Sequence, residues 1–142
     1  MLKFFISLSV SVGLLACTPS VTQAETFSCE GDKDTVGHFM EVTAQDGMVS
    51  KFDYFSSTPV YGAVNNCSVD SGGAKVSLLS DGVQSFALPD DDTVIVSKKD
   101  QQFVFDFSKL SVSHFCGSSS TIAKHLTITP GVKRCSDIDN FR

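Results

Sequence analysis

Basic residues are scarce in this sequence of 142 residues. Eleven Lys and Arg stand against sixteen Asp and Glu, which gives a formal net charge of -5 at pH 7. A nucleic-acid-binding protein needs a basic patch to replace the counterions on phosphates, so this charge balance argues against that class. Trp is absent, yet 42% of the residues are apolar, which is too high a fraction for a disordered chain. At this length we expect one domain.

The apolar run near the start is too short to cross a membrane as a helix. It extends from Phe4 to Ala16 with serines interspersed, whereas a spanning helix needs about 20 apolar residues. Lys3 precedes the run, and no acidic residue occurs before Glu25. A basic start, a short apolar core and a small residue at the exit predict a secretory signal peptide over residues 1–16.

The sequence offers two cleavage sites for this signal peptide. Leu14-Leu15-Ala16-Cys17 resembles a bacterial lipobox, in which a small residue precedes the cysteine that becomes lipidated. Cys17 would then anchor the chain to a membrane, residues 17–26 would form a tether, and residues 27–142 would form a single β domain on the periplasmic face. Each buried methylene of the lipid contributes about 0.8 kcal/mol to such anchoring. The alternative is cleavage after Ala24, with a signal over residues 1–24, which gives a soluble periplasmic protein.

The cysteines lack any Cys-x-x-Cys spacing, which argues against a zinc ribbon or a thioredoxin-type motif. With Cys17 set aside, four remain: Cys29, Cys67, Cys116 and Cys135. An even number in an exported chain predicts two disulfides formed in an oxidising compartment. Of the three pairings, we expect Cys29–Cys67 and Cys116–Cys135, because these close the shortest loops. Each bridge should contribute about 3–4 kcal/mol to stability.

Strand-like stretches recur along the chain at short intervals. Val36–Ala44 and Met48–Phe55 alternate apolar and polar side chains around a turn at Gln45-Asp46-Gly47. Similar pairs occur at residues 74–78 and 83–88 and at residues 93–97 and 102–107, each around a turn with Asp or Asp-Gly. In the last strand Phe103, Phe105 and Phe107 share one face. We predict an all-β fold, a single antiparallel sandwich or small barrel of about eight to ten short strands. Only Thr121–Leu126 has helical character.

The three histidines are the first candidates for catalysis. His38 lies on the same strand face as Met40, and His114 shares a face with Val112, if both segments are strands. A histidine on an apolar strand face is more often a core or edge residue than a base. His125 shares its face with threonines, and we expect it to be exposed.

No catalytic or metal motif is present in the sequence. Gly-x-Ser-x-Gly is absent, and paired cysteines leave no thiol for Cys–His chemistry. His114, Cys116 and His125 imitate a soft metal site, but a disulfide sulfur is a poor ligand. The acidic runs Asp90–Asp92 and Asp137–Asn140 lack the glycine of a calcium loop and are more typical of solvated turns. We therefore predict no catalytic residue, no metal and no cofactor.

The segment from Ser56 to Asn66 is long for a hairpin connection. It presents Pro59, Val60 and Tyr61 rather than plain polar residues. Long loops on rigid β scaffolds often carry recognition, and Tyr is favoured at interfaces, so these three residues are candidate partner-binding residues. In the alternative interpretation, Tyr61 folds back over the core.

These features favour a small exported, non-enzymatic protein of the bacterial cell envelope that binds another macromolecule through surface loops. Its acidic balance would steer a basic protein partner towards it. Two alternatives stay open: an envelope hydrolase that uses carboxylates, whose spacing across a sheet the sequence does not reveal, and a structural envelope lipoprotein with a large exposed apolar patch.

The order of segments from Cys17 onward resembles that of a known group of binding proteins. Cys17, a short tether and Phe27-Ser28-Cys29-Glu30 opening an all-β domain are similar to the membrane-bound lysozyme-inhibitor lipoproteins. This resemblance implies an inhibitor or immunity protein against a cell-wall hydrolase or toxin. Such inhibitors insert a Ser-Gly loop with an aromatic partner, and Ser71-Gly72 here lacks the following Tyr, so the sequence does not assign the chain to that family.

Overall fold

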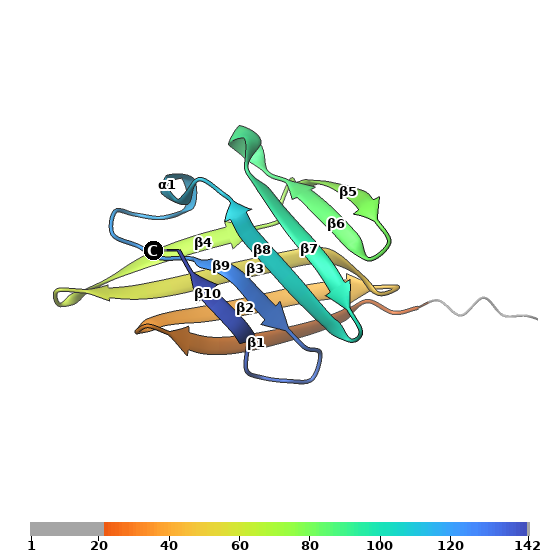
Figure 1. The fold of residues 1–142 in the computed structure, drawn as a ribbon, viewed down its shortest axis with the longest axis horizontal. Helices are drawn as coiled ribbons and strands as arrows, with labels where there is room; N and C mark the ends of the chain where they lie inside the picture. Colours follow the sequence, from red (N-terminus) through yellow and green to blue (C-terminus); the bar gives the residue numbers. More distant parts are fainter. Residues whose placement is uncertain (1–21, 142) are drawn as a thin grey trace, which may run out of the picture.

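A computed structural model describes residues 22–141, which form two antiparallel sheets (Figure 1). The strands are β1 (Glu25–Lys33), β2 (Val36–Gln45), β3 (Met48–Val60), β4 (Ala63–Asp70), β5 (Lys75–Ser80), β6 (Val83–Ala87), β7 (Thr93–Lys99), β8 (Gln102–Lys109), β9 (Ala123–Ile128) and β10 (Ser136–Asn140). A 3-10 turn, η1 (Pro89–Asp91), and a short helix, α1 (Val112–Phe115), interrupt them. The all-β fold predicted from the alternating pattern is confirmed. Cys17 and the predicted signal peptide of residues 1–16 lie outside the described residues.

The chain runs up and down through both sheets in sequence order. One sheet has the order β1-β2-β3-β4, and the other has the order β10-β9-β8-β7-β6-β5. The three predicted hairpins are confirmed as β2–β3, β5–β6 and β7–β8. At the first of these turns, Asp46 and Gly47 both have positive φ, 53° and 74°. Tight two-residue turns need this backbone conformation, which Asp-Gly supplies.

The core lies between the two sheets and is built largely from phenylalanine. Phe52 of β3 packs edge-on against Phe86 and Phe105, with ring centroids 5.2 and 5.4 Å away. Phe103, Phe105 and Phe107 of β8 are all buried, as their shared face predicted. Aromatic pairs of this geometry add about 0.5–1.5 kcal/mol each beyond the burial of their area, so Phe52 joins the two sheets strongly.

The helical prediction for Thr121–Leu126 is wrong. Residues 123–128 form β9, which pairs with β8 on one side and with β10 on the other. Ile122, Ala123 and Leu126 are spaced as on a helix face, but all three are buried within the sandwich. Backbone pairing on both edges therefore overrides the local preference, because a central strand satisfies its hydrogen bonds through its neighbours.

The predicted pairing of the cysteines is also wrong. The disulfides are Cys29–Cys135 and Cys67–Cys116. Cys29 and Cys67 both point inward from the same sheet, but β2 and β3 separate their strands. Three strand spacings amount to about 14 Å, which is far beyond the reach of about 7 Å between the Cα atoms of a disulfide.

The two disulfides fasten both edges of the four-stranded sheet. At the β1 edge, Glu30 N donates to Lys133 O (2.9 Å) and Cys135 N donates to Glu30 O (3.0 Å) beside the Cys29–Cys135 bond. At the β4 edge, Cys67 joins Cys116 at the end of α1. Two such bonds indicate an oxidising compartment outside the cytoplasm. Within residues 22–141 no helix has the length and apolar character needed to span a membrane.

Candidate functional site

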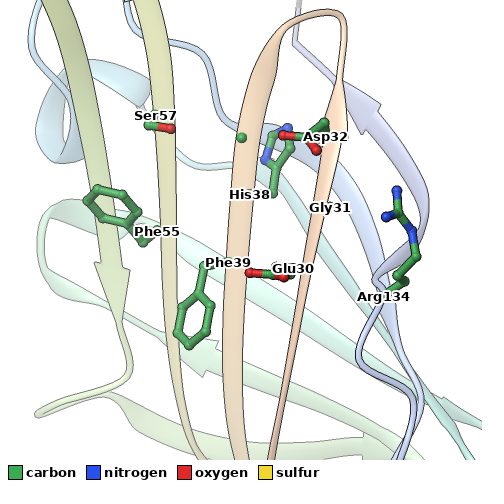
Figure 2. Close-up of a pocket in the computed structure, with 9 residues that line it drawn as sticks. Glu30, Gly31, Asp32, His38, Phe39, Phe55, Ser57 and Arg134 are labelled. Atoms are coloured by element: carbon green, nitrogen blue, oxygen red, sulfur yellow. The ribbon is translucent and has the colours of Figure 1, made fainter.

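A hollow of about 360 Å³ opens on the outer face of the four-stranded sheet (Figure 2). Side chains alternate along each strand, so His38 and Tyr54 point into the core while their neighbours point outward. The outward residues that line the hollow are Glu30, Asp32, Gly37, Phe39, Phe55 and Ser57. The site therefore lies on the sheet surface and not between the two layers.

Gly37 forms the floor of this hollow. In the register of β1, β2 and β3 it lies between Asp32 and Ser57. A Cβ atom at this position would lie 2.9 Å from Ser57 Oγ and 3.6 Å from Asp32 Oδ1. The absence of a side chain thus leaves a gap between a carboxylate and a hydroxyl, which are the groups that accept hydrogen bonds from a cationic ligand.

Two phenylalanines form one wall. Phe39 and Phe55 are directly opposite each other in the β2–β3 register, and each is 40% exposed. Figure 2 shows both rings on the same side of the sheet, with Glu30 extending from β1 towards Phe39. Single exposed apolar residues are common on protein surfaces, but adjacent aromatic rings beside a hollow are typical of interfaces.

The outer face around the hollow is predominantly acidic. Glu41, Asp53 and Asp70 lie opposite one another on β2, β3 and β4, next to the row that contains Phe39 and Phe55. Lys51 neutralises part of this charge through an ion pair with Asp53 at 2.8 Å. Like charges directly opposite each other weaken a sheet, so this arrangement costs stability and needs another reason.

The rim on the β1 side carries the opposite charge. Arg134 lines the hollow beyond the edge of β1, where Figure 2 shows its guanidinium directed away from Phe39. The acidic face is defined here as Glu30, Asp32, Phe39, Glu41, Asp53, Phe55 and Asp70. Its five carboxylates outnumber the three cations beside it, Lys51, Lys133 and Arg134, so it favours positively charged ligands.

A chain of buried polar groups supports the sheet beneath the hollow. Ala123 N donates to the Tyr54 hydroxyl (2.8 Å), which lies 2.8 Å from His38 Nδ1. Burial lowers the pKa of His38 and raises the pKa of Tyr54 to about 12. His38 Nδ1 and the Tyr54 hydroxyl thus share one hydrogen bond, and the chain connects β2, β3 and β9. Gly31 lies opposite His38, and a Cβ atom there would lie 2.8 Å from Ile138 Cδ1, so the absence of a side chain leaves space for Ile138.

A second polar cluster joins Asp92 to α1. Asp92 accepts hydrogen bonds from Ser111 N and from His114 Nδ1, both at 2.6 Å. Burial opposes ionisation of Asp92, but these bonds outweigh it and lower the pKa of its carboxyl. The bond to Asp92 raises the pKa of His114. The prediction of a strand at His114 and that of a solvated turn at Asp92 are both wrong, because the helix turns the imidazole towards a buried carboxylate.

His125 is the third histidine, and two carboxylates lie near it. His125, which is half-buried, lies 3.6 Å from Asp106 and 3.9 Å from Asp139. Burial opposes ionisation of Asp106, but bonds from Ser108 lower the pKa of its carboxyl. No three His, Cys, Asp or Glu side chains within residues 22–141 gather closely enough to hold a metal.

The predicted binding segment is part of a hairpin rather than a loop. β3 continues to Val60 and β4 begins at Ala63, so only Tyr61 and Gly62 form the turn. This hairpin extends beyond the sandwich in Figure 1. The alternative that Tyr61 folds over the core is wrong, because its side chain is fully exposed at 106%. The structure thus presents Pro59, Val60 and Tyr61 at a projecting tip.

The residues of the acidic face were missed at the sequence level. The available signal was Phe39, which interrupts the polar side of an alternating strand beside Glu41 and Thr43. Its proximity to Phe55 and Asp32 depends on the strand register, which no single sequence stretch contains.

Comparison with known proteins gave no match to a family model, a curated protein or a solved structure. The geometry of the acidic face and the chemistry of its side chains therefore carry the functional proposal.

Proposed function

We propose that this chain is an exported, non-enzymatic binding protein of the bacterial cell envelope, whose acidic face binds a basic protein. The observation that carries this proposal is the exposed pair Phe39–Phe55 beside a hollow floored by Gly37, within a surface of mostly negative charge. The Asp53–Asp70 pair, which costs stability, supports a binding role for this charge.

The chemistry of the hollow suits a Lys or Arg side chain of the partner. The aliphatic stem would lie against Phe39 and Phe55, and the cationic head would reach Glu30 and Asp32. Burial of the two rings would provide the apolar part of the affinity, while the surrounding carboxylates would accelerate encounter at low salt. A basic cell-wall hydrolase or toxin fits this description, which makes inhibition or immunity the specific version of the proposal.

The second part of the proposal concerns location. The disulfides support an oxidising compartment, and the sequence pattern at Cys17 favours a lipid anchor. Cys17→Ser should move the protein from the membrane fraction to the soluble periplasmic fraction. Cell fractionation with immunoblotting checks this expectation. A wild-type protein that is already soluble would indicate cleavage after Ala24 instead.

Capture from envelope extract tests the binding. The oxidised protein is immobilised, and bound proteins are identified by mass spectrometry. We expect a basic protein to be retained, and to be lost with Phe39→Ser/Phe55→Ser and with Glu30→Gln/Asp32→Asn. The matched control is Asp46→Asn/Asp100→Asn, which removes the same charge from two turns where Asn tolerates the positive φ of 53°. Equal loss with the control pair would mean that net charge alone is responsible and would overturn the proposal.

The projecting hairpin provides a second candidate surface. Tyr61 is fully exposed at the tip, and Tyr contributes strongly at interfaces. Tyr61→Ser in the same capture experiment separates the two surfaces. If this variant loses the partner while the acidic-face variants retain it, the partner binds at Pro59, Val60 and Tyr61.

A further inference from the structure

Thr22 shows where the N-terminal tether reaches the β domain. Gln45 Nε2, at the end of β2, donates to Thr22 O (3.1 Å), so the chain enters the domain beside the β2–β3 turn. Figure 1 shows the start of β1 at the same end of the molecule as the β2–β3, β5–β6 and β7–β8 turns, with the projecting β3–β4 hairpin at the opposite end. The tether end is defined here as residues 22–23, 46–48, 78–82 and 98–101.

Exposed apolar side chains gather at the tether end. Met48 begins β3, and Leu78 and Leu79 precede the β5–β6 turn; they are 42%, 58% and 60% exposed, respectively. Met48 and Leu78 line one hollow together with Lys98, which also lines the neighbouring hollow that contains Thr22. The apolar side chains and the end of the tether therefore belong to one continuous surface. Neither the acidic face nor the tip of the β3–β4 hairpin includes them, so the proposed partner leaves them uncovered.

Charge does not account for this surface. The tether end carries the carboxylates of Asp46, Asp81 and Asp100 and the ammonium groups of Lys98 and Lys99. The carboxylates outnumber the ammonium groups, so the surface does not attract an anionic partner. Its apolar side chains instead suit a surface that has an apolar layer beneath a polar one, as a bilayer has.

The length of the tether places a bilayer beside this end of the molecule. This step rests on the proposed lipid anchor at Cys17, which lies five positions before Thr22. An extended chain spans at most about 3.6 Å per residue, so the two Cα atoms are at most about 18 Å apart. A lipid on Cys17 therefore keeps the tether end close to the bilayer surface, whereas the tip of the β3–β4 hairpin lies at the other end of the molecule.

We propose that the tether end docks onto the phospholipid bilayer that holds Cys17, with Met48, Leu78 and Leu79 inserted at the level of the headgroups. Met48 comes from the four-stranded sheet and both leucines come from the six-stranded sheet, so the contact fixes the orientation of the domain as well as its distance from the bilayer. The β3–β4 hairpin then points away from the bilayer. The acidic face, on the outer side of the four-stranded sheet, stays open to its partner.

The absence of Trp from the sequence allows a test with single Trp probes. The acylated protein is purified from its host and reconstituted into phosphatidylcholine vesicles whose acyl chains carry bromine near the headgroup. Apolar side chains at an interface are buried about 5–10 Å deep, so the emission of Met48→Trp and of Leu79→Trp should fall at least about twofold relative to vesicles without bromine. Val64→Trp is the matched control, because Val64 in the β3–β4 hairpin is also 60% exposed, and its emission should not change. Emission from Met48→Trp and Leu79→Trp that falls no more than that of the control would overturn the proposal.

Two further measurements separate docking from anchoring. Leu78→Asp/Leu79→Asp, added to Met48→Trp, should abolish the quenching, because carboxylates do not enter the apolar layer. Ala63→Asp/Val64→Asp adds the same charge to the β3–β4 hairpin and should leave the quenching unchanged. Quenching that survives Leu78→Asp/Leu79→Asp would mean that the tether alone sets the distance, and would overturn the apolar contact.

Mass spectrometry of the purified protein tests the anchor by itself. Acyl chains on Cys17 are expected. Their absence would contradict the proposed anchor and the docking with it, whereas an acylated protein without quenching would overturn the docking alone.

Discussion

Two histidines in this fold respond to their surroundings in opposite directions. Burial in the core lowers the pKa of His38, whereas the hydrogen bond to Asp92 raises the pKa of His114 from its ordinary value of 6.5. The folded state therefore binds a proton at His114 more tightly than the unfolded state does. That stabilisation is fully present below pH 6.5 and is lost as the pH rises through the raised pKa.

Tighter proton binding at His114 in the folded state makes the stabilising effect of this residue depend on pH. The midpoint of thermal unfolding should differ between wild type and His114→Ala by more at about pH 5.5 than at about pH 8.5. The effect of His38 is common to both proteins and cancels in the difference. Asp92→Asn should abolish the pH dependence of the difference, because it removes the charge that raises the pKa. The same difference at both pH values would contradict the Asp92–His114 pair.

Gly37 allows a second test at this scale. Gly37→Ala should leave the fold intact, since the added Cβ at 2.9 Å from Ser57 Oγ requires only that the Ser57 side chain rotate about its Cα–Cβ bond. It should weaken binding of the captured partner at least about tenfold, because it fills the floor of the hollow. Gly117→Ala, with no heavy atom within 4 Å of its Cβ, is the control. Titration calorimetry gives both affinities, and equal values would exclude the hollow from the interface.

At the scale of elements, one side chain acts as a strand partner. Gln84 of β6 accepts a hydrogen bond from Val49 N (2.8 Å) and donates one to Val49 O (2.9 Å), so it joins β6 to the opposite sheet. Gln84→Ala leaves both backbone groups unpaired and should lower the free energy of unfolding by about 1–3 kcal/mol. Ser85→Ala is the control on the other face of β6. Urea unfolding measures both, and a loss equal to that of the control would show that water replaces the amide.

The sequence predicted those strands and turns that depend only on neighbouring residues along the chain. The β2–β3 hairpin follows from alternation around Asp46-Gly47, and the buried face of β8 follows from Phe103 and its neighbours. β9 was missed because its pairing with β8 and β10 outweighs its own helical spacing. The acidic face was missed for a related reason, since Phe39 meets Phe55 only through the register of two strands.

For the whole molecule, the disulfides determine how the two sheets stay together. The bonded cysteines are separated by 106 residues for Cys29–Cys135 and by 49 for Cys67–Cys116. The loop-closure estimate gives about 5 and about 4 kcal/mol, respectively. Cys29→Ala/Cys135→Ala should therefore destabilise the protein slightly more than Cys67→Ala/Cys116→Ala, as measured by urea unfolding. Peptide mapping without reduction checks the pairing itself, and a Cys29–Cys67 peptide would contradict the fold.

The two sheets provide separate surfaces. The acidic face occupies the outer side of β1–β4, while β5 ends the other sheet.

Photo-cross-linking in the native host tests the binding face most directly. A photoreactive phenylalanine analogue replaces Phe55, where the ring is 40% exposed and the change is conservative. We expect a covalent adduct with a basic envelope protein, and no adduct when Glu30→Gln/Asp32→Asn is added. The same analogue at Tyr61 should give no adduct with that protein. An adduct from position 61 and none from position 55 would contradict the assignment of the acidic face.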